Sequence, residues 1–284
     1  MENLILQEIY HGKGGKIIWS KDQLDFIITN YNKNHSIPSI AKFFNVCPSS
    51  IRKALRENNI KVLSLEELQK LKYPKNSNFF ENIDTPQKAY WLGFLYADGY
   101  INEKENSLTL NLQLNDKNHL EKFQRAIGAI NNNIGYPKKH TLGKDYYMAM
   151  LSIRDKKIVK DLCNKGCTQN KSLILTFPYK YLTENLYSHF IRGILDGDGT
   201  LYWNGNNFEI GFTGTKELLE AIKYILGKDK ITLSSEGNIY YFKLNGNIQL
   251  KQILEYIYKD SYDEIELTRK RKKYNEFLEM MENK

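Results

Sequence analysis

Two segments of the chain repeat one unusual pattern, an apolar helix-like run that ends in Asp-Gly. Residues 91–99 read Trp-Leu-Gly-Phe-Leu-Tyr-Ala-Asp-Gly, and residues 191–199 read Ile-Arg-Gly-Ile-Leu-Asp-Gly-Asp-Gly. The two aspartates, Asp98 and Asp198, are therefore 198 − 98 = 100 residues apart. A recurrence at this spacing predicts two copies of one folding unit in a single chain.

Small residues stand one turn apart within each predicted helix. Gly93 is followed by Ala97 in the first copy, and Gly193 by Gly197 in the second. Glycine costs about 1 kcal/mol relative to alanine in a helix interior. Its presence at matched positions therefore indicates a compensating gain, the close approach of two helix backbones.

The ends of these helices are marked by capping residues. Thr85-Pro86 is typical of an N-cap followed by proline in the first helical turn. Gly99 and Gly199 follow the two aspartates and suit the left-handed position that ends a helix.

The position of the two acids is electrostatically unfavourable without a partner. A carboxylate in the last turn of a helix faces the negative end of the helix dipole. If the helices lie side by side, Asp98 and Asp198 also repel each other. A divalent cation would relieve both costs, and oxygen donors without a Cys/His cluster favour Mg²⁺, with Mn²⁺ as the substitute.

Each aspartate is followed by a segment of alternating apolar and polar residues, which predicts half-buried strands. Residues 108–115 alternate leucine with polar residues, and residues 208–213 alternate in the same way. The order of elements predicts an α+β fold in tandem copies. The polar face of a sheet in a basic protein can lie along DNA, where Asn111 and Gln113 would suit adenine. An ordinary solvated face is the other interpretation.

Residues 19–60 precede the duplication and have three short runs of helical periodicity. Ser20 and Ser36 are expected N-caps, and Pro48 suits the first turn of the third helix. The short connection before that helix predicts a helix-turn-helix DNA reader. The side chains expected in or beside a major groove are Ser49, Ser50, Arg52, Lys53 and Arg56. A bundle used for protein contacts is the alternative, and the polar residues 64–82 are expected to form a linker.

Charge and cysteine content narrow the class of partner. Lysine and arginine exceed aspartate and glutamate by 41 − 33 = 8, with a pI near 9.0, which favours a polyanion such as nucleic acid. An odd number of cysteines argues against a disulfide framework, and we expect a reducing, cytosolic setting with Cys163 and Cys167 as buried thiols. No apolar run approaches the ~20 residues that span a bilayer.

The two Asp-Gly segments and the residues around them resemble the LAGLIDADG homing endonucleases in their single-chain form with two motifs. The resemblance covers about two thirds of the chain and includes Asn170-Lys171-Ser172, His189 to Gly193, and Leu267 to Lys270 followed by Tyr274. It implies two αββαββα halves, with the motif helices at their interface and two four-stranded sheets forming a saddle on double-stranded DNA. It also implies a monomer that makes a staggered double-strand break, as in the homing of an intron or intein.

The resemblance also implies roles for particular residues. Asp98 and Asp198 correspond to the metal-binding acids, together with the backbone carbonyls of Ala97 and Gly197. The family places a basic side chain near each scissile phosphate, a catalytic role expected of Arg154 or Lys156 in the first half and Lys243, beside Asn245, in the second. Lys171 is expected to contact DNA.

Two departures from the family pattern are present. Tyr96 stands where an additional acid is common, and Arg192 where a small residue is usual. The unequal basic residues of the two halves leave open unequal cutting of the strands. A DNA-binding regulator without cleavage and an intron RNA maturase are the alternative functions on this scaffold.

The sequence divides into three expected domains. Residues 1–75 form the helix-turn-helix and linker, 76–180 the first half, and 181–284 the second.

Overall fold

The computed structural model describes residues 9–12, 16–141, 143–205 and 207–283. The chain divides into two compact units, Met1–Lys72 and Tyr73–Lys284, and the second contains both predicted halves. No helix among the described residues has the length and apolar character required to cross a membrane.

The first unit is a small helical bundle preceded by a two-stranded hairpin. Its elements are β1 (Tyr10–His11), β2 (Ile17–Ile18), α2 (Lys21–Asn34), α3 (Ile37–Phe43), α4 (Pro48–Glu57) and α5 (Leu65–Lys72). Ser20 caps α2 through a reciprocal capping box with Gln23, as expected for this residue pair. Ser36 stands at the N-cap of α3, but its side chain makes no capping hydrogen bond. Pro48 begins α4 in its first turn, as the sequence predicted.

The three predicted helices pack around a common apolar core. Ile27, Tyr31, Ile40, Ile51 and Leu55 are buried at its centre. The interpretation of α2, α3 and α4 as a helix-turn-helix DNA reader stays a prediction.

The expectation that residues 64–82 form a linker is wrong in two places. Residues 65–72 form α5, with glutamates in its first turn and lysines in its last, an arrangement that complements the helix dipole. Phe79 and Phe80 are buried in the core of the second unit, because apolar side chains in a polar stretch still bury against a neighbouring core.

The first half of the second unit has the element order αββαβββα, one strand more than the expected αββαββα. It contains α6 (Pro86–Asp98), β3 (Gly99–Asn102), β4 (Ser107–Gln113), η2 (Leu114–Asp116), α7 (Lys117–Ala126), β5 (Ile134–Gly135), β6 (Lys138–Thr141), β7 (Lys144–Arg154) and α8 (Lys156–Asn164). A connection follows with the short 3-10 turns η3 (Lys171–Leu173), η4 (Tyr179–Tyr181) and η5 (Glu184–Leu186).

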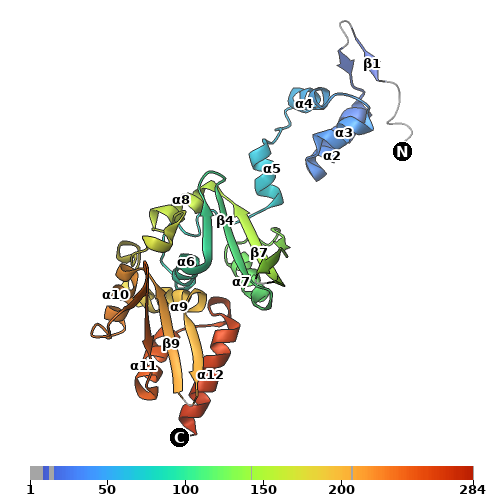
Figure 1. The fold of residues 1–284 in the computed structure, drawn as a ribbon. Coiled ribbons are helices and arrows are strands. Elements are labelled where there is room, and N and C mark those ends of the chain that lie inside the picture. Colours follow the sequence, from blue (N-terminus) through green and yellow to red (C-terminus); the bar gives the residue numbers. More distant parts are fainter. Residues whose placement is uncertain (1–8, 13–15, 142, 206, 284) are drawn as a thin grey trace. The chain divides into compact units, whose positions relative to one another are not determined.

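The second half has the expected order αββαββα. It contains α9 (Tyr187–Gly197), β8 (Thr200–Asn204), β9 (Asn207–Gly214), α10 (Lys216–Ile225), β10 (Ser234–Glu236), β11 (Ile239–Leu244) and α11 (Asn247–Ile257), followed by η6 (Asp263–Ile265) and α12 (Thr268–Glu282). The helices α6 and α9 lie side by side between the two sheets (Figure 1). This is the architecture that the duplicated motif predicted.

Both sheets are antiparallel and have one helix-covered face. The strand orders are β3-β4-β7-β5, with β6 also paired to β7, and β8-β9-β11-β10. Two four-stranded sheets were expected, but the first sheet has a fifth strand, β6, within the described residues. It arises because β7 is eleven residues long and extends beyond β5 to pair with β6.

The alternation in sequence places side chains on the predicted faces. Leu108, Leu110 and Leu112 are buried toward the helices, whereas Asn111 and Gln113 are exposed on the opposite face. The strand ends at Gln113, and Leu114 and Asn115 belong to the following 3-10 turn rather than to the alternation.

Candidate functional site: the paired ends of two motif helices

The two motif helices touch through their backbones at a pair of glycines. A Cβ atom on Gly93 would lie 2.1 Å from the carbonyl oxygen of Phe190, and one on Gly193 would lie 2.2 Å from that of Tyr90. These separations are far below van der Waals contact, so no other residue fits at either position. The predicted close helix contact is confirmed.

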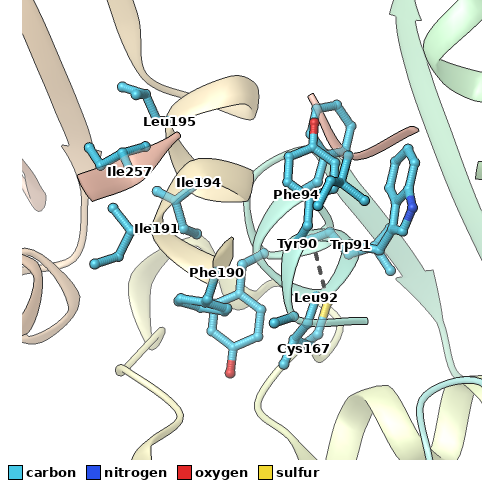
Figure 2. Close-up of a cluster of buried hydrophobic side chains, with 14 of the residues drawn as sticks. Tyr90, Trp91, Leu92, Phe94, Cys167, Phe190, Ile191, Ile194, Leu195 and Ile257 are labelled. Carbon is cyan, nitrogen blue, oxygen red and sulfur yellow. Dashed lines mark hydrogen bonds between the residues drawn. The ribbon is translucent and has the colours of Figure 1, made fainter. Parts of the chain in front are cut away.

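The same face continues one turn later toward the acids. A Cβ on Gly197 would lie 2.3 Å from Cβ of Ala97, so the helices remain in contact up to their C-terminal ends. Buried side chains fill the space around this contact (Figure 2). Those labelled from the two helices are Tyr90, Trp91, Leu92, Phe94, Phe190, Ile191, Ile194 and Leu195.

The helices do not end in left-handed glycines, and that expectation is wrong. Gly99 has φ −73° and ψ 133°, an extended conformation, and Gly199 is not among the residues with positive φ. Both glycines are instead required by crowding. An added Cβ would lie 2.6 Å from the carbonyl oxygen of Leu95 or Leu195, because each chain turns directly from helix into strand.

Asp98 and Asp198 lie at the neighbouring ends of α6 and α9. Asp98 is partly buried, and Asp198 is more exposed. Burial, and then the charge of Asp198, raise the pKa of Asp98 to about 6. Burial also raises the pKa of Asp198. The sequence predicted that two acids approach each other at negative helix ends, and the raised pKa of Asp98 is the expected electrostatic consequence.

Two lysines lie at the C-terminal ends of these helices and offset their dipoles. Nζ of Lys171 donates to the carbonyl oxygen of Gly99. Nζ of Lys270 donates to Gly199 at 2.6 Å and to Asp196 and Gly197 at 2.8 and 3.3 Å. Burial lowers the pKa of Lys270 to about 8, although the nearby carboxylates raise it.

Sequence reasoning missed Lys270 and gave Lys171 a different role. Lys171 is buried and bound to backbone, whereas it had been expected at the DNA surface. A signal for the pair was present, since 270 − 171 = 99 nearly matches the spacing of the acids. A lysine near a helix C-terminus is a common cap.

Arg192 occupies a position where a small residue was expected, and its surroundings explain the difference. The side chain is fully buried, with Nη1 donating to Ile257 at 2.7 Å and Nε to Ile265 at 2.9 Å. Its guanidinium also lies 5.4 Å from the ring centroid of Tyr90. Arg192 therefore binds the C-terminal end of α11 and does not reach the acids through these contacts.

Two of the basic residues expected near the scissile phosphates lie on the sheets, and the third begins a helix. Arg154 ends β7 and forms a 3.5 Å ion pair with Glu105, while Lys156 begins α8. Lys243 lies on β11 and donates to the hydroxyl of Tyr202 at 3.1 Å. None of the three is among the groups that shift the pKa of Asp98 or Asp198; the cations that do are Lys171, Lys270 and, for Asp98, Arg269.

The predicted DNA-contacting residues of the first unit lie together on α4. Ser49, Arg52, Lys53 and Arg56 are exposed, and Ser50 is partly exposed. Lys53 lies 3.9 Å from Glu57 one turn later on the helix. The side chains thus form one accessible polar and basic surface.

The donor set at the paired helix ends fits a hard divalent cation. Two carboxylates with raised pKa values approach each other there, and the carbonyl groups of Ala97 and Gly197 lie in last helical turns, where carbonyls lack intrahelical donors. Within the described part of the chain no cluster of three or more His, Cys, Asp or Glu side chains could hold a metal. A cation here would therefore complete its oxygen shell with backbone, water or a bound phosphate, as Mg²⁺ commonly does.

Comparison with known proteins gives distant likenesses. No family model matches the chain. An uncharacterized protein of Methanocaldococcus jannaschii is 26% identical over 156 residues, 54% of this chain and 55% of that protein. The chain thus spans about half the length of the curated relative it matches.

Three solved structures illustrate the structural comparison. The meganuclease I-SmaMI bound to uncleaveable DNA has 14% identity and a TM-score of 0.44, covering 70% of this chain and 90% of that one. The homing endonuclease I-WcaI bound to its DNA recognition sequence has 16% identity and a TM-score of 0.45, covering 64% and 84%. The N-terminal LAGLIDADG domain of DUF199/WhiA has 13% identity and a TM-score of 0.41, covering 66% and 90%.

The chain's own elements establish the fold. They are the duplicated Asp-Gly motif, the glycine contact between α6 and α9, and an αββαββα order on each side of that contact, with the additional strand β6 in the first half. Residues 73–284 therefore have the LAGLIDADG fold.

Proposed function

We propose that the protein is a metal-dependent endonuclease that cuts double-stranded DNA at a specific site. The observation that carries the proposal is the pair of carboxylates, Asp98 and Asp198, at the touching ends of two helices. Both have raised pKa values, and neither accepts a hydrogen bond or an ion pair from the described residues. Folding gains nothing from such a pair, which is the usual signature of a functional site.

The residues around the acids have two different roles, which are to bind the cation and to fix the helix ends. Asp98 and Asp198, with the carbonyls of Ala97 and Gly197, would hold the cation. When bound, Mg²⁺ would stabilise the negative charge that builds on the attacking and leaving oxygens of a phosphodiester. Lys171 and Lys270 fix the helix ends through their hydrogen bonds to Gly99 and Gly199, so that the two acids keep their separation.

The remainder of the molecule supports a long polyanionic substrate. The net charge of +8 favours phosphate contacts. The outer faces of the sheets carry polar side chains such as Asn111 and Gln113, which can read base edges. The exposed basic surface of α4 would add contacts beyond the sheets, through phosphates and base edges in a major groove.

A plasmid library cut in the presence of Mg²⁺ tests the proposal most directly. We expect linear product from the wild type, and nicked product from Asp98→Asn or Asp198→Asn, each of which would retain duplex affinity. Asp161→Asn is a matched control, because Asp161 pairs with Lys157 on α8, on the helix-covered side of the first sheet. Specific binding without any cut under these conditions would instead favour a DNA-binding regulator.

The contribution of the first unit needs a separate experiment. Removal of residues 1–72 should weaken duplex binding, shorten the footprint and lower the salt dependence, because phosphate contacts release counterions. An unchanged footprint would favour the protein-contact interpretation of the three helices. Binding of structured intron RNA in preference to duplex would favour a maturase.

A further inference from the structure

The two halves can be compared residue by residue around the acids. Lys171 and Lys270 make the same hydrogen bond, to Gly99 and to Gly199, so they occupy matching positions. The residues that precede them therefore also match. They are Asn170 in the first half and Arg269 in the second.

A second pair of matching positions lies at the start of the helices that follow the first two strands. Asp116 is the N-cap residue of α7, and Thr215 is the N-cap residue of α10. Arg269 reaches across the molecule to Asp116, with Nε donating to Oδ2 at 2.8 Å. The corresponding pair, Asn170 and Thr215, has no charge, and the hydroxyl of Thr215 donates to the carbonyl oxygen of Leu175 instead.

The Arg269–Asp116 ion pair is oriented with its positive end outward. The Asp116 side chain is 8% exposed and the Arg269 side chain 47% exposed. The bond to Asp116 uses Nε, and no hydrogen bond joins the two terminal nitrogens to another described residue. A guanidinium fixed at one nitrogen and open at two is suited to a bidentate contact with a phosphate.

The anchor of the guanidinium lies in the half that carries Asp98. Asp116 follows β4, whose Leu110 pairs with Gly99, the residue after Asp98. Burial and the charge of Asp198 raise the pKa of Asp98, and Arg269 is among the cations that oppose this rise. Among the described residues, Arg269 is not one of the cations that lower the pKa of Asp198. Asp198 instead borders a cavity of about 300 Å³, which Tyr96, Ser172 and Thr213 help to line.

We propose that Arg269, held by Asp116, binds the scissile phosphate of the strand cut at the Asp98 half-site and has no counterpart at the Asp198 half-site. The inference rests on the proposed nuclease function and adds a specificity-determining residue to it. Arginine held in this way loses little conformational freedom when it binds phosphate, so the Asp98 half-site is the better prepared of the two. The two strands are therefore cut at unequal rates, and the strand assigned to Asp98 is cut first.

A double-mutant cycle between protein and DNA tests the contact without requiring cleavage. The duplex is the site recovered from the plasmid library, and each strand is identified by the aspartate whose change to asparagine stops its cutting. A methylphosphonate removes the charge of one scissile phosphate at a time, and binding is measured in EDTA. We expect Arg269→Gln to weaken binding of the natural duplex about tenfold, the size of one charged hydrogen-bond contact.

The cycle should be specific to one strand. For the Asp98 strand, the methylphosphonate and Arg269→Gln together should weaken duplex binding no more than either change alone. For the other strand, the two factors by which binding weakens should multiply. Costs that multiply for both strands would overturn the proposed contact.

Strand-resolved cleavage gives the second measurement. With a different label on each strand, the wild type should cut the Asp98 strand faster, and Arg269→Gln should bring the two rates within about twofold, because the charged contact is lost. Arg269→Lys should keep part of the difference, since it retains charge without the planar fork. Equal rates in the wild type would overturn the proposal.

Arg125→Gln is the matched control. Arg125 forms an ion pair of 2.9 Å with Glu264. Like the Arg269–Asp116 pair, this ion pair joins α7 to the region of α12, but Arg125 is not among the groups that shift the pKa of Asp98 or Asp198. It should change neither the strand ratio nor the methylphosphonate effect. A protein that binds no duplex would refute the proposed nuclease, whereas one that binds and cuts with an unaltered strand ratio in Arg269→Gln would refute only the role of Arg269.

Discussion

The two motif helices differ most clearly two residues before each acid. The first has Tyr96, whose hydroxyl donates to the carbonyl oxygen of Lys165. The second has Asp196, which accepts from the backbone N–H of Leu267 at 2.8 Å and from the hydroxyl of Tyr90 at 2.8 Å. Lys165 and Leu267 stand in the segments that lead to Lys171 and Lys270.

A donor in one half and an acceptor in the other therefore perform the same task, which is to fix the segment that carries the capping lysine. The glycines at the helix contact are in contrast identical in the two halves. A position that binds a loop through a side chain can exchange one polar group for another. A position where two backbones touch cannot accept even a methyl group.

Leucine at either contact glycine should have the largest effect. Gly93→Leu or Gly193→Leu would force a side chain into space occupied by the partner backbone, 2.1 or 2.2 Å from a carbonyl oxygen. We expect a loss above the ~3 kcal/mol typical of overpacking, and with it loss of cooperative folding. Thermal melts with and without Mg²⁺ measure this.

A control for that substitution is available on β5. Gly135→Ala would meet only ordinary contacts, 3.8 Å from Cε of Met150, and should melt like the wild type. If both leucine variants also melted and cut normally, the helix contact would be mistaken.

Removal of the polar groups at Tyr96 and Asp196 should lower stability by a smaller amount, and by different amounts in the two halves. Asp196→Ala would leave the N–H of Leu267 and the hydroxyl of Tyr90 without their shared buried acceptor, at a cost of about 3 kcal/mol. Tyr96→Phe removes one donor and should cost about 1 kcal/mol. Urea unfolding at pH 7 measures both, and equal losses would contradict the comparison.

The pH dependence of stability should distinguish the two acids. The pKa of Asp98 is raised to about 6 in the folded protein, so the folded state binds its proton more tightly than the unfolded state does. Without metal, this acid therefore favours folding at low pH, and its contribution is lost as pH rises from about 4 through about 6. Asp98→Asn should remove that dependence.

The size of the effect follows from the shift and from solvent screening. Asp98→Asn should stabilise the metal-free protein at pH 7.5 by about 1 to 2 kcal/mol, discounted because the carboxylate is partly exposed, and by almost nothing at pH 4. Asp198→Asn should stabilise the metal-free protein by less, because Asp198 is more exposed. Melts across pH 4 to 7.5 test this, and a larger gain for Asp198→Asn would reverse the order we assign.

The smallest expected effect concerns the outer sheet faces. Strand pairing puts Ser152 of β7 and Lys243 of β11 at matching places. Ser152 pairs with the β4 residue that pairs with Tyr100, and Lys243 pairs with the β9 residue that pairs with Thr200. Tyr100 and Thr200 each follow an Asp-Gly pair. Lys243→Ser should lower the salt dependence of duplex binding by about one unit of slope, while Ser152→Ala leaves it unchanged. The same slope for Lys243→Ser as for the wild type would place Lys243 outside the DNA contact.

The sequence alone determined the duplication, the close helix contact and the place of the two acids. These features depend on local signals that repeat along the chain. Gly93 and Gly193 recur at the spacing of Asp98 and Asp198, and the alternating leucines of β4 already indicate which side of the strand is buried. Helical and strand periodicity express the covalent geometry of the backbone, so they are visible without a partner.

The tertiary structure decided what surrounds the acids. Lys270 reaches Gly199 across 71 residues and Arg269 reaches Asp116 across 153, and the sequence alone does not reveal that such distant residues meet. Gly99 also shows this limit, since glycine after a helix suits a left-handed turn, whereas here crowding against Leu95 requires it. Periodicity is a property of one segment, but burial, ion pairing and pKa arise only where segments come together.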